Sequence, residues 1–147
     1  MPNHTENLLT IGGDMNVRKD FTRRIKGNNG LIDFTALYPM PEGENWYNWN
    51  CNHWGTKWEP YDVGQWEFDE KHQSIRYHTA WTPPTEFYLY ISTLFPQLIF
   101  KQEYIDEGCD FIGFNIIQNG KIIEEQDYEW ESLAAITMCD KLDFDKD

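Results

Sequence analysis

The sequence predicts an α+β fold of the ferredoxin-like sandwich type, with two helices packed on one face of an antiparallel sheet. Short apolar runs alternate with two amphipathic segments, as expected of two successive β-α-β units. The strands expected near the C-terminus follow one another through tight turns and extend the sheet. At 147 residues with 16% aromatic content, the chain is long enough to bury the core of one domain. A tryptophan-rich loop is expected as an insertion in this fold.

The first half of the chain predicts one β-α-β unit. An apolar run at residues 8–11 predicts the first strand. The next apolar side chains lie four apart, which predicts a helix over residues 14–26 with Asp14 as its N-cap. A second apolar run, at residues 31–38, predicts the second strand, and Pro39 ends it.

The tryptophan-rich segment, residues 46–58, holds four of the seven tryptophans. It shows neither a helical nor a strand period, so we expect a loop that crosses between the second and third strands and folds onto the core. A long loop with this much aromatic surface is either a structural plug or a binding site.

The second half predicts a hairpin, a helix and three further strands. Residues 65–69 and 74–81 alternate apolar and polar side chains, as two paired strands do. An apolar stripe predicts a helix over residues 83–95 on the same face of the sheet as the first helix. The remaining strands are expected at residues 98–105, 111–117 and 121–125. Asn119-Gly120 is a strong signal for a two-residue hairpin turn.

The domain organisation follows from these elements. Residues 1–131 are expected to form a single ferredoxin-like domain, and residues 132–147 a short helix followed by a frayed acidic tail. The N-terminus lacks the features of a signal peptide, and no apolar run reaches the length of a membrane-spanning helix. The three cysteines form no C-x-x-C pair, so reduced thiols in the cytoplasm are expected.

The charge is strongly negative and uneven. The formal net charge is −13, and residues 103–147 carry thirteen acidic residues against three lysines. This balance argues against direct binding to nucleic acid, because phosphate binding needs clustered lysine and arginine. The acidic half is either a solvated face that keeps the protein soluble or a surface that docks on a basic protein.

Several sequence patches together resemble one known family. They are Met1-Pro2-Asn3, residues 37–41, residues 52–58 with 61–63, residues 79–84 and Phe95-Pro96. In this order they resemble the YubB-type ferredoxin-like domain, which plasmids, genomic islands and phages carry. Two departures are His4-Thr5, where the family usually has Trp-Cys, and His53, where it usually has Asn. The resemblance implies a ferredoxin-like fold and a mobile-element setting, and it implies no activity.

Three sequence features resemble parts of a chemical site, but none of them is complete. Cys51 and His53 have a C-x-H spacing, but no second cluster completes a zinc tetrahedron, so we expect neither metal nor cofactor. A nucleophilic pair of Cys51 with His53 or His78 lacks a visible orienting residue, and no catalytic residue is assigned. Gly12-Gly13 lacks the phosphate-loop patterns and is expected to be a tight turn.

The tryptophan-rich segment supplies the candidate ligand site. Its expected residues are Trp54, Thr56, Lys57, Trp58, Asp62, Tyr77, Thr79 and Trp81. In one interpretation they line a concave aromatic pocket for a flat or small polar ligand, with Lys57 in a cation–π contact or paired with Asp62. In the other, Trp54 and Trp58 plug the sheet face and Lys57 points outward.

The expected function is that of a non-enzymatic acidic binding protein of a phage or other mobile element. It would dock on a host protein with a basic surface, such as a defence or nucleic-acid-binding protein, because its field attracts basic surfaces. The expected partner-binding residues are Glu124, Glu125, Asp127 and Glu129. The alternatives are a small-ligand-binding protein or enzyme that uses the tryptophan-rich segment, and a purely structural phage component.

Overall fold

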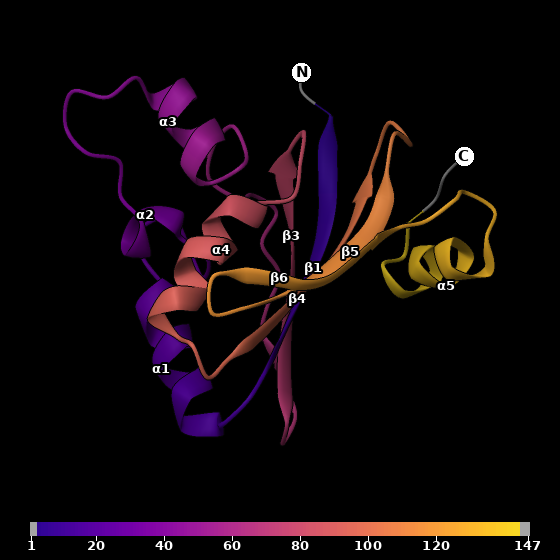
Figure 1. The fold of residues 1–147 in the computed structure, drawn as a ribbon, viewed down its shortest axis with the longest axis horizontal. Helices are drawn as coiled ribbons and strands as arrows, with labels where there is room; N and C mark the ends of the chain where they lie inside the picture. The colour runs from indigo at the N-terminus through magenta and orange to yellow at the C-terminus, as the bar shows by residue number, and fades with distance from the viewer. Residues whose placement is uncertain (1–2, 145–147) are drawn as a thin grey trace.

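The computed structural model describes residues 3–144, and its strands form one antiparallel six-stranded sheet in the order β2-β3-β1-β4-β5-β6 (Figure 1). The strands are β1 (His4–Gly12), β2 (Glu67–Phe68), β3 (His72–Ala80), β4 (Ile99–Asp106), β5 (Ile112–Gln118) and β6 (Lys121–Asp127). The helices are α1 (Met15–Ile25), α2 (Phe34–Leu37), α3 (Trp46–His53), α4 (Thr85–Leu94) and α5 (Leu133–Lys141).

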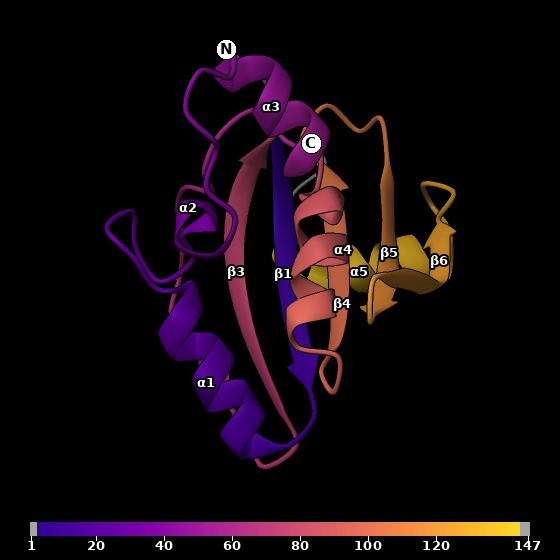
Figure 2. The same ribbon diagram turned by 60° about the vertical axis from the view of Figure 1, so that its left-hand side comes forward.

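The ferredoxin-like core consists of β1, α1, β2, β3, α4 and β4. β1 lies between β3 and β4 and is antiparallel to both. In each β-α-β unit a third strand therefore separates the two strands that the helix connects: β3 lies between β1 and β2, and β1 lies between β3 and β4. Helices α1 and α4 lie on the same face of the sheet, and α5 lies on the opposite face (Figures 1 and 2). The predicted fold class is therefore confirmed, with β5 and β6 as the extra C-terminal strands.

The main core lies between the sheet and the helices α1 and α4, and it is rich in aromatic rings. Phe21 of α1 contacts Phe95 and Phe100 edge-on, with ring centroids 5.2 and 5.4 Å apart. A second, smaller core forms where α5 covers the other face. There Ala135 and Met138 of α5 belong to one buried apolar cluster with residues of β1, β4 and β5. The expectation of a frayed end from residue 140 is wrong for residues 140–142, because Asp140 and Lys141 belong to α5 and Leu142 is buried in this core; residues 145–147 lie outside the described residues.

The prediction of a second strand at residues 31–38 is wrong. Residues 34–37 form the short helix α2, and β2 supplies the second strand of the fold. Asp33 is the N-cap of α2, and its carboxylate accepts hydrogen bonds from the backbone N–H groups of Thr35 and Asn29. Glu59, far along the chain, accepts from the N–H of Phe34 at 2.7 Å. Two carboxylates thus satisfy the free N–H groups of a helical turn, which outweighs the strand propensity of the apolar run.

The tryptophan-rich segment is not wholly a loop. Residues 46–53 form helix α3, whose N-cap Asn45 accepts from the N–H of Asn48 at 3.0 Å. The helix ends before Gly55, which has φ +78° and whose missing Cβ would lie 3.1 Å from the backbone N of Glu86. The segment therefore belongs to the connection between α1 and β2, rather than to a loop between two strands as expected.

The predicted hairpin turn at Asn119-Gly120 is present between β5 and β6. Both residues have positive φ, +48° and +79°, which is the backbone of a type I′ turn. Among the described residues, no helix has both the length and the apolar character needed to cross a membrane.

Candidate functional site

Lys57 lies against two indole rings beside the tryptophan-rich segment. Its Nζ is 4.5 Å from the ring centroid of Trp58 and 4.9 Å from that of Trp81. Tyr47 of α3 meets Trp81 edge-on, with centroids 6.0 Å apart. Trp58 is 38% exposed, so it does not plug the sheet face as one interpretation expected. These residues form an exposed aromatic surface whose rings already hold a cation, a contact worth about 0.5–1 kcal/mol at such sites.

Half of the side chains predicted to bind a ligand lie in the core instead. They are Trp54, Thr56, Tyr77 and Thr79. The hydroxyl of Thr56 donates to the carbonyl of Ala80 at 2.6 Å, and the hydroxyl of Thr79 donates to the carbonyl of Thr82 at 2.7 Å. These groups fasten the segment to the end of β3. The concave pocket predicted from them is therefore corrected to a packed junction beneath the exposed aromatic surface.

Asp62 pairs with His78 rather than with Lys57. Its carboxylate is 2.8 Å from Nδ1 of His78, and the carboxylate of Glu6 is 3.3 Å from Nε2 of the same ring. The ring of His4 stacks on His78 with centroids 5.6 Å apart, and Nδ1 of His4 is hydrogen-bonded to the hydroxyl of Tyr61. Two histidines, a tyrosine and two carboxylates thus meet where β1, β3 and the segment before β2 lie side by side.

The electrostatics of this histidine cluster favour the charged form of His78. The hydrogen bond to Glu6 raises the pKa of His78 above its usual 6.5, against the opposing effect of burial, and Asp62 raises it further. Burial raises the pKa of Tyr61 as well. Such groups can hold or transfer a proton. Over residues 3–144, no group of three or more His, Cys, Asp or Glu side chains is placed to hold a metal ion.

The predicted partner-binding residues lie on and just after β6, the strand at one edge of the sheet. All seven residues of β6 are exposed, whereas the sequence led us to expect only alternate side chains in water. Glu125 and Asp127 share the face of Asn115, while Glu124 projects on the face of Ile116. Burial, together with Asp127 and Glu125, raises the pKa of Tyr104 to about 12. Asp127 and Glu125 are therefore close enough to Tyr104 on β4 to disfavour its charged form.

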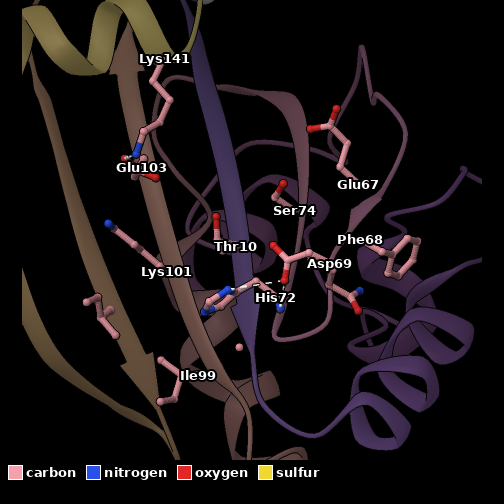
Figure 3. A pocket seen from close by; sticks show the side chains of 13 residues that line it. Thr10, Glu67, Phe68, Asp69, His72, Ser74, Ile99, Lys101, Glu103 and Lys141 are labelled. Atoms are coloured by element: carbon pink, nitrogen blue, oxygen red, sulfur yellow. Dashed lines mark hydrogen bonds and ion pairs between the residues drawn. The ribbon is translucent and has the colours of Figure 1, made fainter.

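A hollow of about 590 Å³ lies on the half of the sheet that α5 leaves uncovered. Figure 3 shows Thr10, Ser74, His72 and Lys101 projecting from three neighbouring strands around it. The ion pair between Lys141 and Glu103, with 2.8 Å between Nζ and Oε2, forms its wall on the side of α5.

The sequence prediction named Asp62 and His78 for separate sites but did not bring them together, and it missed the hollow, since the residues of each site are far apart in the chain. The one available signal was the alternation of polar residues along a predicted strand. Residues 74, 76 and 78 of the predicted hairpin are polar at every second position, which marks a face that is not packed under the main core.

The strand order and the two helices on one face define a ferredoxin-like α+β domain. The chain belongs to the family described as the ferredoxin-like domain in Api92-like protein, whose family model matches residues 53–145. The predicted ferredoxin-like family is thereby confirmed, while the YubB-type name and the mobile-element setting stay predictions.

Among solved structures, the chain is similar to the crystal structure of a protein api92 from Yersinia pseudotuberculosis. The TM-score is 0.55 with 13% sequence identity, over 66% of this chain and 39% of that chain. At this identity the similarity shows the fold alone, and it spans well under half of that protein. No curated protein matches the chain.

Proposed function

We propose that this protein is a non-enzymatic binding module that docks a basic, extended segment of a partner protein along β6. One observation carries the proposal: β6 is a seven-residue edge strand whose residues are all exposed. An edge strand presents a row of unpaired N–H and C=O groups, which is the template for adding a strand from another chain.

The two edges of the sheet differ in how open they are. The opposite edge is β2, which has only two residues, Glu67 and Phe68. A very short edge strand offers little backbone for pairing. β6 pairs with β5 on one side, and its other side faces away from the sheet. A partner strand therefore finds its longest template at β6.

The charges of β6 select a basic partner. Glu124 projects on one face, and Glu125 and Asp127 on the other, so carboxylates flank the edge on both sides. Glu129, also exposed, lies two residues after the end of the strand. Lysine or arginine at successive positions of an added strand would meet a carboxylate on either face. The same charges repel a second copy of this acidic edge, which leaves β6 free for a partner of opposite charge.

The biological setting is proposed from the sequence resemblance alone. In that setting the protein belongs to a phage or other mobile element, acts in the bacterial cytoplasm, and docks on a host protein. A defence protein or a nucleic-acid-binding protein fits, because such proteins carry basic surfaces.

The experiment is capture of partners from host lysate by the wild type and by a variant with Glu124, Glu125, Asp127 and Glu129 all changed to Lys. These side chains are exposed, so the variant should fold, as checked by circular dichroism. Capture should fall sharply in the variant, and wild-type capture should weaken with added salt as the charges are screened. For the identified partner, binding should protect the amides of β6 from hydrogen exchange.

A matched control changes four other exposed acids to Lys. Glu42, Glu44, Glu70 and Asp110 serve, since they lie outside β6. This control should retain capture, although it alters the net charge by the same amount. If the folded β6 variant captures the same proteins as the wild type, or if the control loses them equally, the edge is not the docking surface.

The alternative function is a small-ligand-binding protein or enzyme that uses the tryptophan-rich segment. It is supported by the exposure of neighbouring aromatic rings, since Trp46 is 49% and Tyr47 is 40% exposed. A surface of this kind is typical of contact sites. Quenching of tryptophan fluorescence by a ligand, lost in Trp58→Ala, would favour this alternative over docking at β6.

A further inference from the structure

The hollow on the second face of the sheet contains one straight row of polar side chains. Glu67 of β2 lies opposite Ser74 of β3, Ser74 lies opposite Thr10 of β1, and Thr10 lies opposite Lys101 of β4. Directly opposed residues of antiparallel strands project to the same face. Neighbouring strands are about 4.8 Å apart, so the Cα atoms at the two ends of the row are about 14 Å apart.

The two ends of the row carry opposite charges. Over residues 3–144, neither Lys101 nor Glu67 has an ion-pair or hydrogen-bond partner for its side chain. The Lys101 ammonium lies over the ring of Phe114, 5.3 Å from its centroid. The row therefore offers a cation at β4 and a carboxylate at β2.

The other charges around the hollow already have partners. Glu103 is paired with Lys141 at 2.8 Å, and Oδ1 of Asp69 accepts from the backbone N–H groups of Lys71 and His72, each at 2.8 Å. These pairings leave Lys101 and Glu67 as the charges best able to bind a ligand. The lining is thus polarised along the row, with a cation at one end and a carboxylate at the other.

Two hydroxyl side chains lie in the middle of the row, and the floor of the hollow beside them is open. The hydroxyls of Thr10 and Ser74 have no hydrogen-bond partner in the described part of the chain. In the next row, Gly12 lies between His72 and Ile99, and a Cβ at Gly12 would lie 3.3 Å from the His72 ring. The missing side chain therefore keeps the floor clear. The volume of about 590 Å³ lies within the roughly 300–1,000 Å³ of small-molecule sites.

We propose that this hollow binds a short linear peptide of two or three residues in its zwitterionic form. Its terminal carboxylate would pair with Lys101 and its terminal ammonium with Glu67. An extended chain of three residues spans about 10 Å, and the long, flexible side chains of Lys101 and Glu67 can turn to meet its two termini across a row of about 14 Å. The hydroxyls of Thr10 and Ser74 meet the peptide groups between the termini. A single amino acid holds its two charges too close together to reach both ends.

Isothermal titration calorimetry with trialanine tests the proposal, and it does not depend on the function assigned to β6. The wild type should bind trialanine, and Lys101→Met and Glu67→Gln should each weaken binding about tenfold or more. N-acetyl-trialanine lacks the ammonium, so the wild type should bind it more weakly than trialanine. Glu67→Gln should no longer distinguish the two peptides. Lys26→Met and Glu42→Gln, exposed elsewhere, are the matched controls and should bind like the wild type.

Each variant should unfold thermally at about the same temperature as the wild type, since both end side chains lie at the surface of the hollow, and this checks that the sheet is intact. The proposal is overturned if trialanine does not bind the folded wild type at millimolar concentration. It is also overturned if the acetylated and free peptides bind equally, or if the controls weaken binding as much as the two variants of the row.

Discussion

Trp54 and Trp58 are four residues apart, yet the structure gives them different energetic roles. Trp54 is 4% exposed, contacts the rings of Phe34 and Trp49 with centroids 5.4 and 5.7 Å away, and donates its indole N–H to Tyr38 O at 2.9 Å. Trp54→Ala removes this ring from the core and leaves a cavity. The expected loss of unfolding free energy is about 3–5 kcal/mol.

Trp58 should behave as a surface residue. It is 38% exposed, and its ring contacts the Lys57 ammonium. In Trp58→Ala the space left by the ring opens to solvent instead of becoming a cavity. The loss of unfolding free energy then has two parts: the transfer free energy of the covered part of the ring, and the cation–π contact with Lys57. We expect about 1–2 kcal/mol.

Urea unfolding followed by far-ultraviolet circular dichroism measures both losses. The two variants should retain the wild-type slope of free energy against urea, so their midpoints compare directly. A loss for Trp58→Ala equal to that for Trp54→Ala would refute the reasoning, because it would mean that Trp58 plugs the core. Trp54→Phe is the control, and it should recover part of the loss by refilling the cavity.

Three further predictions concern other parts of the chain. Asp33→Ala removes the N-cap of α2 and should cost about 0.5–2 kcal/mol in the same urea assay, while a neutral effect would contradict the capping role. The pKa of His78 is raised in the folded state, mainly by Glu6, so its contribution to stability is complete below about pH 6.5 and is lost as pH rises through the raised pKa. The wild type should therefore lose stability relative to His78→Gln as the pH rises above about 6.5, and parallel pH profiles would refute this. The purified protein should carry no stoichiometric zinc, and elemental analysis showing one zinc per chain, lost in Cys51→Ser, would overturn that prediction.

Hydrophobic periodicity by itself determined the frame of the fold. Helix α1, with its cap at Asp14, the helix α4 and the strands from β3 to β6 lie close to where the spacing of apolar residues predicted them. Apart from β6, which is exposed throughout, these elements bury a face or a stripe of apolar side chains, so their pattern is local and can be read directly. The hairpin turn at Asn119-Gly120 was equally predictable, because it depends on two adjacent residues that accept positive φ.

Only the tertiary structure decided what happens between α1 and β2 and what lies on the second face of the sheet. The apolar run around Phe34 became a helix because Glu59, 25 residues away, accepts its backbone N–H. Trp54 is buried against the rings of Phe34 and Trp49, whereas Trp58 lies at the surface against Lys57, and the contact of Trp54 with Phe34 joins parts of the chain that no local pattern brings together. The row from Glu67 to Lys101 exists through strand register alone. Such pairings join distant parts of the chain, and their energy depends on contacts that no local pattern encodes.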